Sequence, residues 1–119
     1  MRRRDLIESF ALAALVLAPA SAAAHHGWGS YDASKTLTLN GKIMDGAYQN
    51  PHGTLRFESD GKVWLVILAP PFRMQNRGLP AEKLAPGTAA TVVGYAHRSE
   101  PNELRAERIL IDGRTVELR

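Results

Sequence analysis

The chain has 119 residues, a formal net charge of +3 at pH 7 and no cysteine. Without cysteine, disulfide bonds, thiolate metal sites and cysteine nucleophiles are excluded, so any metal ion must be held by nitrogen and oxygen atoms. Lys and Arg are scattered among acidic residues rather than gathered in a stripe, which argues against a nucleic-acid-binding surface.

Residues 1–24 have the layout of a secretory signal peptide. Arg2, Arg3 and Arg4 form a basic start, an apolar run follows from Phe10 to Ala18, and small residues come next. The apolar run is shorter than the roughly 20 residues that a membrane-spanning helix needs. We therefore expect a periplasmic or secreted protein without a transmembrane segment. Export through a Sec signal is expected, with the Tat route as the alternative because Arg3-Arg4 fits a loose twin-arginine pattern.

Two cleavage positions fit the A-x-A rule for signal peptides. A cut after Ala22 leaves Ala23 as the first mature residue, whereas a cut after Ala24 leaves His25. Residues 25–119 are then expected to form a single domain, because about 95 residues suffice for one small core and not for two.

From Thr36 onward the apolar residues alternate over short segments, as is typical of strands. Gly41 and Gly46 indicate a bend within the first strand, and two Asp-Gly pairs, at residues 60–61 and 112–113, predict hairpin turns. The only helical pattern covers Phe72–Leu84 and is interrupted by Gly78. The expected strands are Thr36–Tyr48, Thr54–Glu58, Lys62–Leu68, Thr88–Tyr95, Arg105–Ile111 and Thr115–Leu118.

This order of elements predicts an all-β protein with one short helical segment. Three strands, a helical segment and then two or three strands match a small OB-like Greek-key barrel, in which the helix lies between the third and fourth strands. A small β-sandwich is the alternative.

Several short motifs resemble those of the DUF6152 family, small exported bacterial proteins of unknown function. The motifs are His25-His26, Tyr31-Asp32, Asn50-Pro51-His52 and Asp112-Gly113, and the resemblance covers residues 25–118. It supports the expected fold and export. The family has no established activity, so the chemistry must be inferred from the residues themselves.

The four histidines are the strongest chemical feature. His25 and His26 lie at the expected mature end, His52 lies between the first two strands, and His97 lies between the fourth and fifth. Imidazole and amine nitrogens without thiolates suit Cu(II), whereas three histidines and a water suit zinc. An N-terminal His25 would bind one ion through both its amine and its ring. We expect a protein that binds Cu(II) for metal delivery, storage or sensing, with zinc or no metal as alternatives.

The second hypothesis is a non-catalytic module of the cell envelope that contacts a protein or a glycan through its OB face. Aromatic side chains beside strands also serve as packing, and a histidine pair at a chain end also occurs in flexible termini, so both hypotheses stay open. The residues expected to contact a partner or ligand are Trp28, Tyr31, Tyr48, Asn50 and Tyr95.

No enzyme is expected from the sequence. It contains no phosphate loop, dinucleotide fingerprint, HExxH pair or nucleophile elbow. The run of charged residues from Arg98 to Arg108 is expected to be a solvated loop and strand face.

The position of the signal cleavage is a first testable prediction. Because Ala22-Ala23-Ala24 directly precedes the histidine pair, we expect the exported chain to begin at His25. N-terminal sequencing of the exported protein measures this. A start at Ala23 would contradict the prediction and would remove the combined amine and imidazole chelation at His25.

Overall fold

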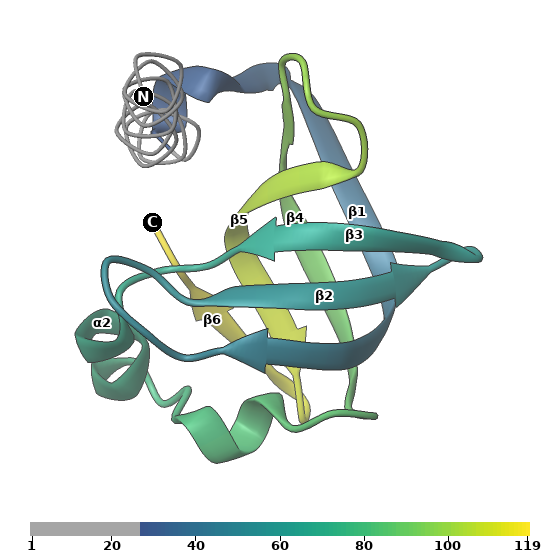
Figure 1. Ribbon diagram of the computed structural model, residues 1–119. Coiled ribbons are helices and arrows are strands. Elements are labelled where there is room, and N and C mark those ends of the chain that lie inside the picture. Colours follow the sequence, from purple (N-terminus) through teal and green to yellow (C-terminus); the bar gives the residue numbers. More distant parts are fainter. Residues whose placement is uncertain (1–26) are drawn as a thin grey trace, which may run out of the picture. The chain divides into compact units, whose positions relative to one another are not determined.

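The computed structural model describes residues 27–119, and a division of the chain falls between Ser30 and Tyr31. Before the division, Trp28–Ser30 form a short 3-10 helix, η1. After it, residues 31–119 form six strands with one α-helix and one further 3-10 helix (Figure 1). Their bounds are β1 Tyr31–Ala47, β2 Thr54–Ser59, β3 Lys62–Ile67, α2 Pro71–Asn76, η2 Ala81–Leu84, β4 Ala89–His97, β5 Glu103–Ile111 and β6 Arg114–Glu117.

The six strands form one sheet that closes on itself. Their order is β3-β2-β1-β4-β5-β6, and β3 pairs additionally with β5. The β3–β5 pairing is parallel, with Leu65 opposite Glu103 and Ile67 opposite Arg105, and the other pairings are antiparallel. The predicted all-β class with one short helix is confirmed, and this barrel-like closure is the connectivity expected of an OB-like barrel.

The long first strand makes the closure possible because it pairs with β2 along one part and with β4 along another. The predicted bend is present: a Cβ atom on Gly41 would lie 1.8 Å from the carbonyl oxygen of Glu58, so only glycine allows this approach. The strand begins at Tyr31, earlier than predicted. Its first residues pair with β4 before a register shift between Asp32 and Thr36, and such a bulge interrupts the alternation on which the prediction depended.

The two predicted Asp-Gly turns are confirmed. Asp60 and Gly61 have φ values of 50° and 75° and join β2 to β3, and Asp112 and Gly113, at 53° and 71°, join β5 to β6. Positive φ at both central residues matches the twist of the flanking strands, which explains the preference for this dipeptide.

The predicted helical segment consists of two separate helices, α2 and η2. Gly78, with a φ of 85°, divides them, and Pro71 begins α2 at a position where its missing N–H costs nothing. Within residues 27–119, no helix has the length and apolar character needed to cross a membrane.

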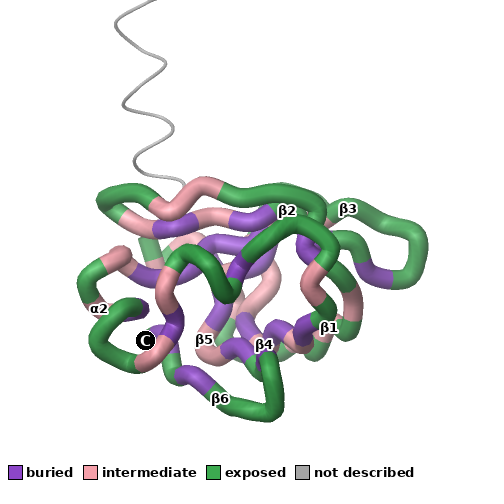
Figure 2. Tube along the Cα trace, turned by 90° about the horizontal axis from the view of Figure 1, so that it is seen from below, coloured by how far each residue is buried: buried purple, intermediate pink, exposed green. Residues whose placement is uncertain are grey.

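The core lies inside the closed sheet. Figure 2 shows buried stretches along β2, β4 and β5. Trp64 is half-buried and packs against the buried core residues. The fully buried side chains include Ile43, Leu55, Phe57, Val66, Met74, Leu79, Val92, Leu104, Ile109 and Leu118.

The closeness of β4 and β5 gives a prediction for stability. A Cβ atom on Gly94 would lie 2.1 Å from the carbonyl oxygen of Arg105, so Gly94→Ala must push two backbones apart. We expect a loss of folding free energy at or above the roughly 1–3 kcal/mol typical of overpacking. Urea denaturation measures it, with Ala89→Gly at the exposed start of β4 as the control. A Gly94→Ala protein as stable as wild type would contradict the β4–β5 register.

Candidate functional site

His52 lies in the loop between β1 and β2 and is half-buried. Its Nδ1 lies 3.3 Å from the carbonyl oxygen of Gly53. A carbonyl oxygen only accepts hydrogen bonds, so Nδ1 must be the donor, and in the neutral ring the lone pair then belongs to Nε2. This hydrogen bond therefore places the lone pair of the neutral His52 ring on Nε2.

His97, the last residue of β4, has the opposite arrangement. Its Nδ1 accepts hydrogen bonds from the backbone N–H groups of Ser99 at 3.1 Å and Glu100 at 3.0 Å. The single lone pair of a neutral imidazole is therefore engaged on Nδ1, and the ring proton belongs on Nε2. Nε2 in turn lies 4.0 Å from Oε2 of Glu103. His97 is thus incorporated into the β4–β5 turn with its lone pair engaged on Nδ1.

Tyr31, His97 and Glu103 form a buried polar cluster, named here the Tyr31 cluster. The Tyr31 hydroxyl donates to Oε2 of Glu103 at 2.5 Å, and the Tyr31 ring packs edge-on against the His97 ring with centroids 5.0 Å apart. Tyr31 is 2% exposed and Glu103 is 5% exposed. The cluster joins β1, β4 and β5 on the sheet face opposite Leu104, because successive side chains of a strand point to opposite faces.

Burial of Glu103 corrects one prediction from the sequence. The run from Arg98 to Arg108 was expected to be a solvated loop and strand face, and Arg98, Ser99 and Glu100 are indeed exposed. Glu103 is buried because the parallel pairing with β3 brings a fourth strand beside it. The only signal of this burial in the sequence is that Glu103 lies two residues before Arg105, where a strand is predicted to begin.

The pKa values of the Tyr31 and Arg105 side chains reflect this burial. Burial, the hydrogen bond to Glu103 and the negative charge of Glu103, in that order, raise the pKa of Tyr31 far above its ordinary value of 10.0. Burial also lowers the pKa of the half-buried Arg105, whose charge interacts with Tyr31. The hydroxyl of Tyr31 therefore remains a proton donor to Glu103 throughout the neutral range.

The other predicted contact residues differ in their local surroundings. Tyr48 donates to the carbonyl oxygens of Leu79 at 2.8 Å and Pro71 at 3.3 Å, and its side chain lines a pocket of about 250 Å³ between the end of β1 and η2. Asn50 is exposed and precedes a cis peptide bond to Pro51. Trp28 is half-buried in η1, and Tyr95 is half-buried on β4 opposite Arg105.

The structure does not bring the two described histidines together. His97 is the register partner of Tyr31, the first residue of β1, whereas His52 follows Ala47, the last residue of β1. Residues 27–119 contain no group of three or more His, Asp or Glu side chains arranged to hold a metal ion. His25 and His26 lie outside the described residues, so a site that includes them stays a prediction.

Together the fold and the Tyr31 cluster define a small barrel-like β protein with a buried polar cluster on the face opposite its core. The chain belongs to the DUF6152 family, a family of unknown function, whose pattern matches residues 13–104. The match includes Tyr31, His52, His97 and Glu103 and confirms the resemblance found in the sequence. No curated protein matches the chain.

The tyrosines give a prediction for alkaline stability. The pKa of Tyr31 is raised in the folded protein. The contribution of Tyr31 to the free energy of unfolding is therefore complete below 10.0, its pKa in the unfolded chain, and is lost as pH rises from there toward its pKa in the folded protein. We expect Tyr31→Phe to lose about 1.5–3 kcal/mol at neutral pH, the range for a hydrogen bond to a charged group. Above pH 10 the stability of the Tyr31→Phe protein should fall less steeply with pH than that of wild type. Urea denaturation between pH 7 and 11 measures both effects.

Tyr48→Phe is the matched control for this experiment. The pKa of Tyr48 is also raised, by burial and then by the charge of Glu82, but its hydroxyl donates to backbone carbonyl groups and not to a carboxylate. A Tyr31→Phe protein with the alkaline slope of wild type would contradict the assigned role of the Tyr31–Glu103 hydrogen bond.

Proposed function

We propose that the protein is an exported, non-enzymatic binding protein that takes up Cu(II), outside the cytoplasm, for metal delivery, storage or sensing. The observation that carries the proposal is the hydrogen bond between Nδ1 of His52 and the carbonyl oxygen of Gly53. Histidines that bind metal ions commonly donate their second ring N–H to a carbonyl or carboxylate, which orients the ring and directs the other nitrogen to the metal. His52 has this arrangement.

The proposed ligands are Nε2 of His52 together with the amine and the imidazole of an N-terminal His25, with His26 as a further nitrogen. His97 is left out of this set because its lone pair is engaged by Ser99 and Glu100. Nitrogen ligands without thiolates favour Cu(II) over competing divalent ions, with zinc as the alternative. Because a free α-amine loses its proton near pH 7.7–8.0, affinity should rise with pH through about that range.

Copper titration of single-histidine variants tests the proposal. We expect His52→Ala to lose at least about tenfold in Cu(II) affinity, equivalent to roughly 1.4 kcal/mol, because one of the few strong ligands is removed. His97→Ala should keep the affinity of wild type. A chain with one extra alanine before His25 should lose the combined amine and imidazole chelation. The d–d absorption band and intact mass follow binding, and circular dichroism checks that each variant is folded.

The pair of histidine variants separates the proposal from adventitious binding. Equal affinity of wild type, His52→Ala and the extended chain would mean that the terminus binds copper without the folded domain. A loss in His97→Ala with none in His52→Ala would overturn the assignment made from the two ring tautomers.

A second candidate function is a non-catalytic module of the cell envelope that binds a partner or a glycan. The observation in its favour is the pocket of about 250 Å³ beside Tyr48, whose remaining walls are mostly apolar. The Tyr48 hydroxyl donates to two backbone carbonyl oxygens, and these hydrogen bonds hold the ring in a fixed position, as a binding platform requires. Failure of wild type to bind copper in the titration above would favour this function.

A further inference from the structure

Four side chains form a row across four neighbouring strands, named here the Leu110 row. The members pair in register from strand to strand, and they are Asn40 of β1, Thr91 of β4, Leu110 of β5 and Thr115 of β6. Register partners point to the same face of a sheet, and successive residues of a strand point to opposite faces. Because Ile111, next to Leu110, is buried in the core, the Leu110 row lies on the outer face of the sheet.

A groove of about 550 Å³ lies along the Leu110 row, and all four members of the row line it. Its other walls come from the bend of β1 at Gly41, the start of β4 at Ala89 and the turn between β5 and β6. The volume falls within the roughly 300–1,000 Å³ that is typical of ligand sites. The pocket beside Tyr48, at about 250 Å³, is smaller.

Hydrogen bonds hold Asn40 in place at one side of the groove. Oγ1 of Thr91 donates to Oδ1 of Asn40 at 2.6 Å, and Oγ of the buried Ser59 donates to the carbonyl oxygen of Asn40 at 2.7 Å. Because the first bond engages the oxygen of the side-chain amide, the NH2 group is the part of the exposed Asn40 side chain that can donate to a ligand.

The turn between β5 and β6 supplies charged groups of both signs. Asp112 and Arg114 line the groove and are exposed. Nζ of Lys83, from η2, donates to Oδ2 of Asp112 at 2.8 Å, so Oδ1 is the oxygen that can accept from a ligand. The lining of the groove therefore offers both donors and acceptors, with one acid and one base, rather than charge of a single sign.

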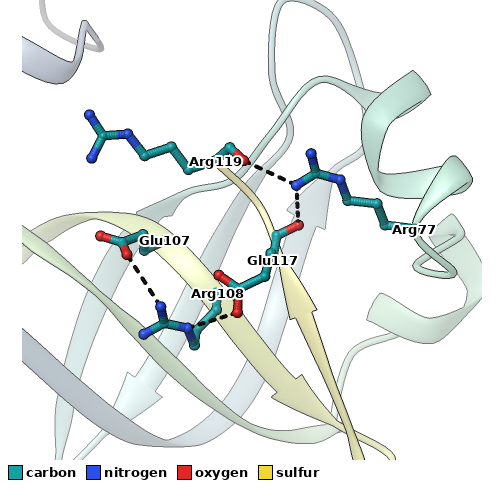
Figure 3. Close-up of polar contacts among 5 residues, drawn as sticks. All are labelled: Arg77, Glu107, Arg108, Glu117 and Arg119. Atoms are coloured by element: carbon teal, nitrogen blue, oxygen red, sulfur yellow. Dashed lines mark hydrogen bonds and ion pairs between the residues drawn. The ribbon is translucent and has the colours of Figure 1, made fainter.

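The neighbouring row on the same face has its charges paired with each other. Its members are Thr38, Val93, Arg108 and Glu117. Nε of Arg108 donates to Oε2 of Glu117 at 2.9 Å, and Nη2 of Arg108 lies 3.3 Å from Oε1 of Glu107 (Figure 3). The Leu110 row contains only uncharged side chains, and Leu110 itself is 39% exposed. An apolar contact surface thus lies among amide and hydroxyl groups.

We propose that the groove along the Leu110 row is a binding site for a neutral oligosaccharide. A sugar ring presents apolar C–H groups on its faces and hydroxyl groups around its edge, and each hydroxyl can both donate and accept. Leu110 provides the contact for the C–H groups, the NH2 group of Asn40 donates to a hydroxyl, and Oδ1 of Asp112 accepts from one. A peptide that adds a strand uses the backbone of an open sheet edge, whereas this groove lies on the face of paired strands.

Titration of the exported protein with cellohexaose, maltohexaose and chitohexaose, in buffer without copper, tests this site. We expect saturable binding of at least one of these sugars, which Asn40→Ala and Leu110→Ser each weaken by at least about fivefold, as loss of one net contact predicts. Asn76→Ala is the matched control, because Asn76 is an exposed asparagine at the end of α2, outside the groove. It should bind as wild type does. Calorimetry measures the affinities, and circular dichroism checks that each variant is folded.

NMR spectroscopy separates this site from the two functions proposed above. In wild type, the bound sugar should shift the amide signals of the Leu110 row. Shifts confined to the residues around Tyr48 would overturn this site and favour the pocket there. His52→Ala should bind the sugar as wild type does, so failure of copper binding and failure of this site are distinguishable. Absence of saturable binding of all three sugars, or equal weakening in Asn76→Ala, would also overturn the proposal.

Discussion

A carboxylate buried at the point where the sheet closes is the constraint on which much of this structure depends. Glu103 begins β5 and is the register partner of Leu65 on β3, so it lies within the parallel pairing that closes the sheet. A buried charge is costly unless it is hydrogen-bonded. The Tyr31 hydroxyl, from the first residue of β1, donates a hydrogen bond to the Glu103 carboxylate. The Tyr31 ring packs against the ring of His97, the last residue of β4. Satisfying one carboxylate therefore holds three strands in register.

Local backbone groups give the two described histidines different arrangements. The β4–β5 turn engages the lone pair of His97 on Nδ1 and directs Nε2 toward Glu103. The β1–β2 loop does the reverse for His52, because a carbonyl oxygen can only accept. Two residues that are chemically equivalent in the sequence thus differ in the ring nitrogen that keeps the lone pair, and the difference arises from local backbone groups.

Charge on the face opposite the core is organised in two adjoining parts. The Tyr31 cluster contains a buried carboxylate, and Arg105, two residues along β5, is half-buried, with a pKa that burial lowers. Because Arg105 is half-buried between neighbouring strands, its charge is less screened than that of a surface arginine such as Arg56. The proposed copper ligand His52, in the loop after β1, belongs to a different part of the fold from Arg105 on β5.

The sequence by itself determined the local structure of this protein. Alternation placed the strands, Gly41 marked the bend of β1, and Asp60-Gly61 and Asp112-Gly113 fixed two hairpins, because these signals act through neighbouring residues. Only the tertiary structure decided that β3 pairs with β5 and that Glu103 is buried. Such contacts join segments far apart in the chain, and no periodicity or spacing encodes which strands meet. The ring nitrogen on which each histidine keeps its lone pair was likewise decided by backbone groups that only the folded loops bring within hydrogen-bonding distance.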